Sequence, residues 1–434
     1  MIGSMRSNSF LLLILLAFLL VGAMYAMEIP PWQAPDEPAH YNYVSQLAAG
    51  QMPVIEVDDY DEAYRSRIVS ERFPPDLSIE PLTYEDWQPP LYYLLLVPVF
   101  QLSGGMLLPL RLASLLIGLA VVVVTYYATG ELWPQREWLP LTATAFVAFL
   151  PQHVAGLATV NNDGLAELVI ATILWLLLRG VRRPATAAGQ WPLIGALLGI
   201  GFLTKATVYL MLPVVAFALW LRYRGHWPAM RRAAVKVALP AFLLGLVWWS
   251  RNLAVYGGVD ILGKSAHDRI VVGQLRTVDW VADLGAGPAL RQFVVTAFQS
   301  FWGQFGWMGV VMDRWVYAAL ALFVLVVILG LVLAWVKRPG DAAGRQQALI
   351  LLATAVCTLI LFLGYNLTFV QPQGRYLFPA LIPVASAVAL GLYAWVRQLG
   401  RRRWLNWLLP AGLALALIGL DLLALVRYII PQLG

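Results

Sequence analysis

The sequence predicts an all-α polytopic membrane protein with about 11 transmembrane helices, because of its composition and its recurring apolar runs. Of its 434 residues, 60% are hydrophobic and 12% are charged, whereas a soluble domain carries about 25% charged residues. Runs of about 20 apolar residues match the thickness of a bilayer core, and in lipid a helix satisfies its own backbone hydrogen bonds. The net charge of +6 fits basic loops on one side of a membrane and does not require a nucleic-acid partner.

The first apolar run, residues 10–27, could be taken for a secretory signal because Arg6 precedes it and Ala26 lies near its end. It is longer than a usual signal-peptide core, and no good small-x-small cleavage site precedes Met27. We therefore expect an uncleaved first span. The single cysteine, Cys357, lies in another apolar run. It excludes a disulfide within the chain and a Cys-rich metal site.

The other apolar runs bring the expected number of spans to eleven. We expect them at residues 10–27, 106–129, 139–154, 162–179, 191–204, 207–222, 235–255, 315–336, 347–366, 376–396 and 404–428. The stretch 191–223 is too long for one span, so we expect a hairpin that turns near Lys205. A further run from Pro89 to Gly105 is short and contains Pro98, which favours a re-entrant or interfacial helix.

The distribution of basic residues predicts the orientation of these spans. With the N-terminus inside and the short run excluded, the cytoplasmic segments hold 17 of the 30 Lys and Arg residues. A twelfth span would turn those clusters outward, against the positive-inside rule. These residues are Arg6, Arg136, Arg179, Arg182, Arg183, Arg222, Arg224, Arg231, Arg232, Lys236, Lys337, Arg338, Arg345, Arg397, Arg401, Arg402 and Arg403. We therefore expect the N-terminus inside and the C-terminus outside.

Two large loops are then expected on the outer side. Residues 28–90 hold 13 of the 24 acidic residues but only three basic ones, and this loop continues through the interfacial run to residue 105. The second loop covers residues 256–313. Loops of this length are usually functional or bind a partner. We expect residues 1–396 to form one transmembrane module that carries both outer loops, and residues 397–434 a basic cytoplasmic turn with the last span.

The first outer loop opens with the stretch PPWQAPDEPAHYNYV, which places Asp36 and Glu37 between two prolines. Pro38 suits the first turn of a helix and Gly50 suits its end, so we expect a short amphipathic helix on the outer surface. Asp36 or Glu37 would cap it. Capping explains one acid but not the second acid or His40, which makes all three candidate catalytic or binding residues.

The end of the same loop reads YEDWQPPLYY. Glu85 and Asp86 are each more readily explained as solvated loop acids. The following Gln88 and Tyr92 are more distinctive, because two prolines forbid a helix up to that point and an aromatic pair then enters the membrane interface. Gln88 and Tyr92 are therefore candidate substrate-binding residues.

The stretch NNDGLAELV supplies polar groups where the fourth span begins. Asn161, Asn162 and Asp163 are natural helix caps, but by their expected position they could also line a pocket beside the first outer loop. Glu167, one turn further, would lie inside the span, where buried acids tend to be functional.

Three basic residues lie on the expected outer side, in three different spans. Lys205, Arg251 and Arg375 could each simply extend to the lipid head groups. Together they suggest an anion site, and phosphate is the natural membrane-borne ligand for Arg and Lys. The histidines His153, His226 and His267 show no paired metal-ligand spacing, so a zinc site is unsupported. A carboxylate-bound divalent cation stays open.

The order of these motifs resembles that of the GT-C membrane glycosyltransferases, up to about residue 395. The likeness is to bacterial relatives of the protein O-mannosyltransferases and of the lipid A aminoarabinose transferase. The stretches that carry it are PDEPAH, PPLYY, RLASLLIGLAVVVVTYYATGELW, NNDGLAELVIATILWLLLRG, GIGFLTKATVYLMLP, WWSRNLAVYG and QGRYLFPALIP. The second outer loop contains no recognisable periplasmic domain.

The resemblance implies an enzyme that moves a sugar from a polyprenyl-phosphate carrier to an acceptor on the outer side of the membrane. The acid that such enzymes carry in the first outer loop, as catalytic base or metal ligand, corresponds here to Asp36, with Glu37 beside it. An acceptor hydroxyl needs a carboxylate within reach, and a departing phosphate needs positive charge. This arrangement implies inversion at the anomeric carbon, by analogy with inverting glycosidases.

Residue roles follow from this resemblance. We expect Arg375, Lys205 and Arg251 to bind the phosphate, His40 to orient Asp36 or donate to substrate, and Tyr376 to contact substrate beside Arg375. The acceptor is a glycan, a lipid or a protein. Two alternatives stay open, a transporter for lipid-linked sugars and a noncatalytic protein that binds them. A transporter commonly shows internal repeats, and none is visible.

Overall fold

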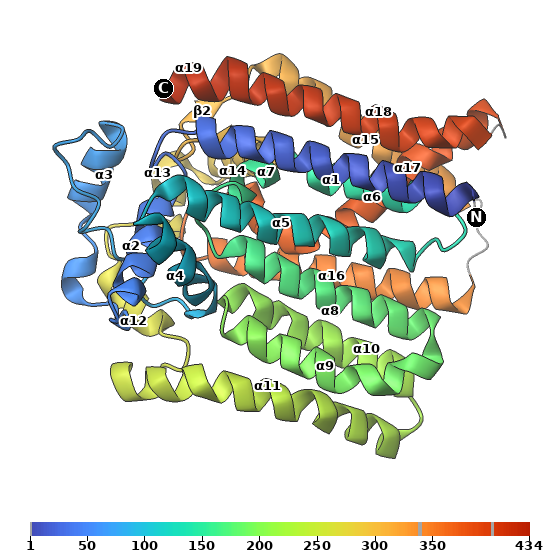
Figure 1. The fold of residues 1–434 in the computed structure, drawn as a ribbon, viewed down its shortest axis with the longest axis horizontal. Helices are drawn as coiled ribbons and strands as arrows, with labels where there is room; N and C mark the ends of the chain where they lie inside the picture. The colour runs from blue at the N-terminus through green and yellow to red at the C-terminus, as the bar shows by residue number, and fades with distance from the viewer. Residues whose placement is uncertain (1, 337–340, 401–402) are drawn as a thin grey trace.

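The apolar runs form a helical bundle in the computed structural model, which describes residues 2–336, 341–400 and 403–434. The predicted cytoplasmic residues Lys337, Arg338, Arg401 and Arg402 lie outside the described residues. The long helices are α1 (Ile2–Glu28), α5 (Leu107–Gly130), α8 (Asp163–Arg182), α9 (Pro184–Phe202), α11 (Trp227–Tyr256), α15 (Arg314–Val336), α16 (Ala342–Asn366), α17 (Leu381–Leu399) and α18 (Arg403–Leu423). They run side by side in Figure 1.

Shorter elements connect and cap these helices. They are α2 (Glu37–Ala48), η1 (Val57–Asp59), α3 (Glu62–Ser70), α4 (Leu91–Ser103), α6 (Trp138–Ala148), α7 (Pro151–Leu157), η2 (Ala206–Leu210), α10 (Met211–Tyr223), α12 (Lys264–Ile270), α13 (Thr277–Leu284), α14 (Ala286–Trp302), η3 (Gly374–Ala380), η4 (Ala424–Ile429) and α19 (Ile430–Leu433). Two strands of two residues, β1 (Gln304–Phe305) and β2 (Val310–Val311), pair antiparallel, and the sequence did not predict them.

Nine helical segments of the described residues are long and apolar enough to cross a membrane. They match nine of the expected spans, with α11 extending further toward its N-terminus than predicted. The expected span 139–154 is instead two helices, α6 and α7. Leu150 has an extended backbone, ψ 114°, because the residue before a proline is disfavoured in the helical region. The expected span 191–204 corresponds to the second half of α9, which ends at Phe202 and whose apolar part, Gly189–Phe202, is shorter than the nine.

The bundle has two apolar cores, one on each side of α5 and α8. The first joins α1, α5, α6, α7, α15, α17 and α18 through residues such as Phe18, Phe146 and Leu417. The second joins α8, α9, α10 and α11 through residues such as Leu174, Leu198 and Val214. The helix α18 packs against α6 and α1, so the last helix shares the first core with the rest of the bundle.

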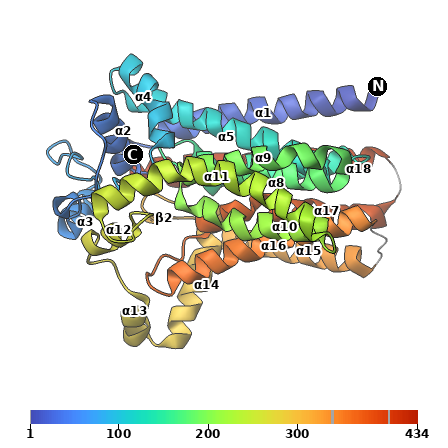
Figure 2. The ribbon, with the colours of Figure 1, turned by 90° about the horizontal axis from the view of Figure 1, so that it is seen from below.

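The two ends of the bundle differ in composition. At one end, Arg182 pairs with Asp341 at 2.7 Å and Arg183 with Glu131 at 3.3 Å, which joins three of the basic loops. At the other end lie α2, α3, α4 and α12, together with the C-terminus (Figure 1). Figure 2 shows α13 and the start of α14 standing away from the bundle at that same end. We call it the acidic end, since it carries residues 28–90.

The short helices α2 and α4 form the lid of the acidic end. The helix α2 begins one residue before Pro38 and ends before Gly50, whose φ is 81°, as the sequence predicted. Its Tyr43 and Val44 are fully buried and pack with Tyr92 and Leu96 of α4. This apolar contact fixes the start of α2, and therefore Asp36, over the ends of α5 and α8.

Candidate functional site

Asp36 is held at the acidic end by contacts from two distant parts of the chain. Asp36 occupies the N-cap position of α2, as one of the two predicted alternatives had it, but its φ of 67° is left-handed and its side chain makes no capping bond. Instead, Oδ1 accepts from the Tyr84 hydroxyl at 3.1 Å and Oδ2 accepts from Arg375 Nη2 at 3.1 Å. A left-handed backbone at a non-glycine residue is uncommon and is concentrated at functional sites.

Burial alone would raise the pKa of Asp36, but the charge of Arg375, the proximity of His40 and the Tyr84 hydroxyl together hold it below the ordinary value. An opposite charge favours the ionised form of an acid. Asp36 is therefore a carboxylate at neutral pH, with a side chain that is 29% exposed. The exposed part of this carboxylate is accessible to a hydroxyl from solvent.

Glu37 lies next to Asp36 in sequence but in a different environment. Arg111 of α5 donates to Glu37 Oε1 from Nε at 2.8 Å and to Oε2 from Nη2 at 2.6 Å. The backbone N–H groups of Val160 and Trp32 also donate to this carboxylate. Because Glu37 is fully buried, its position does not suit the expected catalytic role. It suits a residue that holds Asp36 in place.

Arg111 also binds the end of the first helix. Its Nη1 donates to the carbonyls of Ala26 and Ile29 at 2.9 and 2.6 Å, groups that a helix end leaves without partners. One buried guanidinium thereby connects α1, the start of α2 and α5. This arrangement fixes the backbone that carries Asp36.

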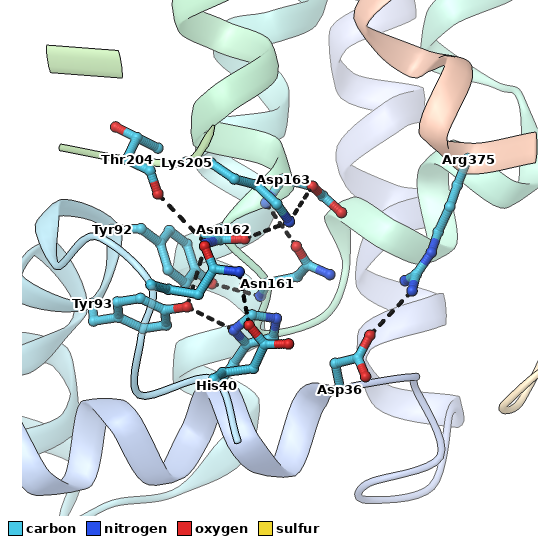
Figure 3. Close-up of polar contacts among 12 residues, drawn as sticks. Asp36, His40, Tyr92, Tyr93, Asn161, Asn162, Asp163, Thr204, Lys205 and Arg375 are labelled. Atoms are coloured by element: carbon cyan, nitrogen blue, oxygen red, sulfur yellow. Dashed lines mark hydrogen bonds and ion pairs between the residues drawn. The ribbon is translucent and has the colours of Figure 1, made fainter. Parts of the chain in front are cut away.

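A second ion pair lies across the site from Asp36. Lys205 Nζ is 2.6 Å from Asp163 Oδ1 and donates to Asn162 Oδ1 at 2.8 Å, as Figure 3 shows. Lys205 lies at the turn between α9 and η2, where the sequence predicted it. Asn162 is fully buried, and its Nδ2 donates to the Gln88 side-chain oxygen, the Tyr93 hydroxyl and the Thr204 carbonyl, so it holds this turn.

The aromatic pair of α4 supports His40 and the polar turn before α8. His40 Nδ1 is 2.8 Å from the Tyr93 hydroxyl. Burial and the charge of Lys205 lower the pKa of His40 to about 3, so His40 is neutral at physiological pH. Tyr92 is fully buried and bonds Ser114 and the Asn161 N–H. These contacts make Tyr92 a support of the site and not a group that faces the pocket.

Glu85 lies among the same charges. Burial, and next the charge of Asp36, raise the pKa of Glu85 to about 7. Gln88, a predicted substrate-binding residue, donates from Nε2 to Glu85 Oε2 at 2.8 Å. Glu85 is thus one of the groups of this site that change charge near neutral pH, and it is not the solvated loop acid that the sequence favoured.

Arg251 does not join this group. Its guanidinium contacts the Pro53 carbonyl, the Tyr256 hydroxyl and Asn252, and it lies over the Trp248 ring. It therefore fastens the first outer loop to α11. Of the three cations expected at a phosphate, Lys205 and Arg375 both lie near Asp163. The Cζ atom of Arg375 is 5.5 Å from the centroid of the Tyr376 ring.

A pocket of about 640 Å³, including its opening to solvent, extends from Arg375 and Asp163 toward the bundle interior. Ala34 and Pro35, directly before Asp36, form part of its wall. Its deep end carries Glu167 and His153, whose Oε2 and Nε2 atoms are 2.7 Å apart. Apolar lining with a few convergent polar groups is the usual character of a ligand pocket.

The side chains present do not fit the divalent cation that the sequence left open. Within residues 2–336, 341–400 and 403–434, no group of three or more His, Cys, Asp and Glu side chains could hold a metal ion. Arg375 and Tyr84 contact the Asp36 carboxylate, while Arg111 holds that of Glu37.

Three residues of the site were not predicted from the sequence as functional candidates. They are Arg111, Tyr84 and Glu85. Arg111 carried a usable signal, because it is a fourth basic residue at the outer end of a span and departs from the cytoplasmic pattern. Tyr84 and Glu85 carried none, since an acidic loop gives no indication of which members fold inward.

Comparisons with known proteins agree with this fold. The model of the dolichyl-phosphate-mannose-protein mannosyltransferase family matches residues 87–250. The undecaprenyl phosphate-alpha-4-amino-4-deoxy-L-arabinose arabinosyl transferase of Erwinia tasmaniensis is 25% identical over 128 residues, or 29% of this chain and 23% of that protein. The match therefore spans about a quarter of the relative's length.

Two solved structures resemble the whole chain. ArnT from Cupriavidus metallidurans bound to undecaprenyl phosphate aligns over 97% of this chain and 73% of its own, with a TM-score of 0.50 and 16% identity. The Archaeoglobus fulgidus oligosaccharyltransferase aligns over 98% of this chain and 54% of its own, with a TM-score of 0.55 and 13% identity. The resemblance to GT-C membrane glycosyltransferases is confirmed, and the fold is all-α and GT-C-like.

Proposed function

We propose that this protein transfers a sugar from a polyprenyl-phosphate donor to a hydroxyl-bearing acceptor at the acidic end of the bundle. The observation that carries the proposal is the contact between Asp36 Oδ2 and Arg375 Nη2 at 3.1 Å. A carboxylate of the first outer loop and a guanidinium of the last third of the chain meet at the mouth of one pocket. Sugar transfer from a lipid phosphate needs such an acid and such a cation.

The reaction is a single displacement. The acceptor oxygen forms a bond to the anomeric carbon as the bond from that carbon to the phosphate oxygen breaks, and the electron pair leaves with the lipid phosphate. Asp36 takes the proton of the acceptor hydroxyl. Arg375 and Lys205 bind the departing phosphate, while Glu37, through Arg111, fixes the backbone of Asp36. Attack opposite the leaving group inverts the anomeric carbon, as in inverting glycosidases.

Donor binding itself would activate Asp36. In the structure Arg375 lowers the pKa of this carboxyl, which makes it a weak base. A lipid phosphate that takes over Arg375 removes the hydrogen bond and part of the positive charge from Asp36. Its pKa then rises toward a value better suited to accepting a proton. The enzyme would thereby be a poor base until donor is bound.

The substrates fit this assignment. Polyprenyl phosphate belongs to the bilayer, and its phosphate would lie at the membrane surface beside Lys205, at the turn of a hairpin. The ArnT of Cupriavidus metallidurans was crystallised with undecaprenyl phosphate bound to it. We propose the same class of carrier here. The acceptor is a glycan, lipid or protein hydroxyl.

The proposed orientation in the membrane rests on the charge difference between the two ends of the bundle. Nine segments are long and apolar enough to cross a membrane. The α6–α7 pair and α9 bring the number of passes to eleven if these shorter helices also traverse the bundle. An odd number of passes agrees with termini at opposite ends of the bundle in Figure 1. By the positive-inside rule the end with Arg182 and Arg183 faces the cytoplasm. The site then faces outward from a bacterial inner membrane.

The test compares Asp36→Asn and Asp36→Ala with the wild type in purified protein. We expect sugar transfer from the polyprenyl-phosphate sugars tried to fall at least about 100-fold, because general-base catalysis contributes factors of that order. Binding of undecaprenyl phosphate should persist in Asp36→Asn. The matched control is Asp58→Asn, in the same loop and exposed, which should transfer normally.

Two outcomes would contradict the proposal. Transfer at the wild-type rate by Asp36→Asn would remove Asp36 as the base. Movement of lipid-linked sugar across proteoliposomes that contain no acceptor, with no transfer when acceptor is added, would instead support a transporter.

A further inference from the structure

The deep end of the pocket contains a pair of ionisable groups that the proposed reaction does not use. Glu167 is one turn beyond Asp163 on α8, so the two carboxylates lie on the same face of that helix. His153 on α7 contributes Nε2, which is 2.7 Å from Glu167 Oε2. Both residues are buried, and a carboxylate at membrane depth needs a reason.

The proton count of this pair is fixed in part by its surroundings. The carbonyl of Val147 lies 2.8 Å from His153 Nδ1, and a carbonyl only accepts, so Nδ1 carries a proton. One further proton is then shared between Nε2 and Oε2. Phe378 meets the His153 ring edge to face at a centroid distance of 5.3 Å, which holds the ring in place.

The second oxygen of Glu167 is available to a ligand. Within the described part of the chain, the hydrogen bond to His153 is the one made by this side chain, and Glu167 lines the pocket. Oε1 is not among the buried side-chain atoms that lack a partner, so this oxygen is open to the pocket. Glu167 therefore presents an unfilled, oriented acceptor to whatever occupies the pocket.

The pocket combines charged, polar and apolar lining groups. Arg375, which we assign to the phosphate, and Pro35, next to the proposed base, both line it. Phe305 and Ile29 give apolar walls, while Gln152 and Asn161 add polar groups. Gly156 also lines the pocket, and a side chain added there would meet no atom within 4 Å.

We propose that this pocket holds the sugar ring of the donor, with Glu167 accepting a hydrogen bond from a ring hydroxyl remote from the phosphate and His153 positioning Glu167. The inference rests on the proposed function, since it takes the phosphate at Arg375 as its fixed point. It adds the class of group that the enzyme selects. A hydroxyl donor fits because it can donate to Oε1 while His153 stays on Oε2.

The experiment measures the affinity of detergent-solubilised full-length protein for undecaprenyl phosphate and for the same lipid loaded with glucose, galactose, mannose or arabinose. Wild-type protein should bind at least one loaded lipid about tenfold more tightly than the bare lipid, since a hydrogen bond to a charged group stabilises by about 1.5 kcal/mol or more. In Glu167→Gln that preference should fall severalfold, with bare-lipid affinity kept.

A second variant acts by volume and does not rely on Glu167. Gly156→Phe places a ring in the pocket and should abolish the preference for loaded lipid while leaving the bare lipid bound. The matched control is Gly130→Phe at the opposite end of the bundle, where an added side chain also meets no atom within 4 Å. It should keep the preference.

The outcomes separate this inference from the function on which it rests. If bare undecaprenyl phosphate binds, and Arg375→Ala weakens that binding, the phosphate assignment stands. Equal affinity for bare and loaded lipids in the wild type, or an unchanged preference in both Glu167→Gln and Gly156→Phe, would then overturn the sugar subsite alone. Failure to bind any of these lipids would overturn the proposed function as well.

Discussion

Glu85 is a carboxyl group of the site that changes charge near neutral pH. Its pKa of about 7 lies above the ordinary 4.5 because of burial and the charge of Asp36. A raised pKa means that the folded protein favours the protonated form, so this group's contribution to stability is present at low pH and is lost as pH rises through about 7. Above that pH a second negative charge stands beside Asp36 and the proposed phosphate site.

We therefore expect the apparent affinity for the lipid phosphate to fall as pH rises through about 7 in the wild type. Glu85→Gln should remove that step, because an amide stays neutral. The matched control is Glu80→Gln, an exposed acid of the same loop, which should keep it. Measurement of donor KM between pH 5.5 and 8.5 checks this. An identical midpoint in wild type and Glu85→Gln would show that another group is responsible.

Single-residue reasoning from the sequence succeeded where a residue departs from its surroundings. Asp36, Lys205 and Arg375 are charged groups placed against the local pattern, and the structure brings them to one place. Arg251 satisfied the same criterion, but it binds the Pro53 carbonyl. An unusual charge in the sequence indicates a buried or interfacial side chain and does not indicate what that side chain binds. The roles of Asp36 and Glu37 could not be separated in sequence, since their difference depends on Arg111, 74 residues away along the chain.

At the scale of elements, the Glu37–Arg111 pair joins α1, α2 and α5. Removal of one partner of a buried ion pair leaves an uncompensated charge, at a cost of about 3–5 kcal/mol. Glu37→Ala should therefore lower the thermal unfolding midpoint strongly. Glu71→Ala removes an exposed partner of Arg67 and should cost less than about 1 kcal/mol. Thermal unfolding followed by circular dichroism checks both variants.

Equal shifts in the two variants would show that the buried pair does not hold these helices.

The elements expected from the sequence were mostly correct, since the length of the apolar runs predicted nine spans and the prolines and Gly50 predicted α2. The exceptions have local causes. The break before Pro151 divided one expected span, and hydropathy alone could not indicate it because Phe149 and Leu150 are as apolar as the helices around them.

At the scale of the whole molecule, charge at the two ends of the bundle determines sidedness. The acidic loop 28–90 and the basic loops lie at opposite ends, and the proposed site requires the acidic end to face outward. Asp76 in the acidic loop and Arg231 in a basic one are both exposed. Each is therefore a suitable position for a reporter in a chain whose single cysteine, Cys357, lies within α16.

In a Cys357→Ala background, we expect Asp76→Cys in intact spheroplasts to react with a membrane-impermeant maleimide and Arg231→Cys to react only after the membrane is permeabilised. The reason is that moving the five basic residues between 222 and 236 outward would oppose the positive-inside rule. The reverse labelling would place Asp36 in the cytoplasm. A donor carried on the outer leaflet could not then reach it, so this measurement tests the function and the fold's orientation together.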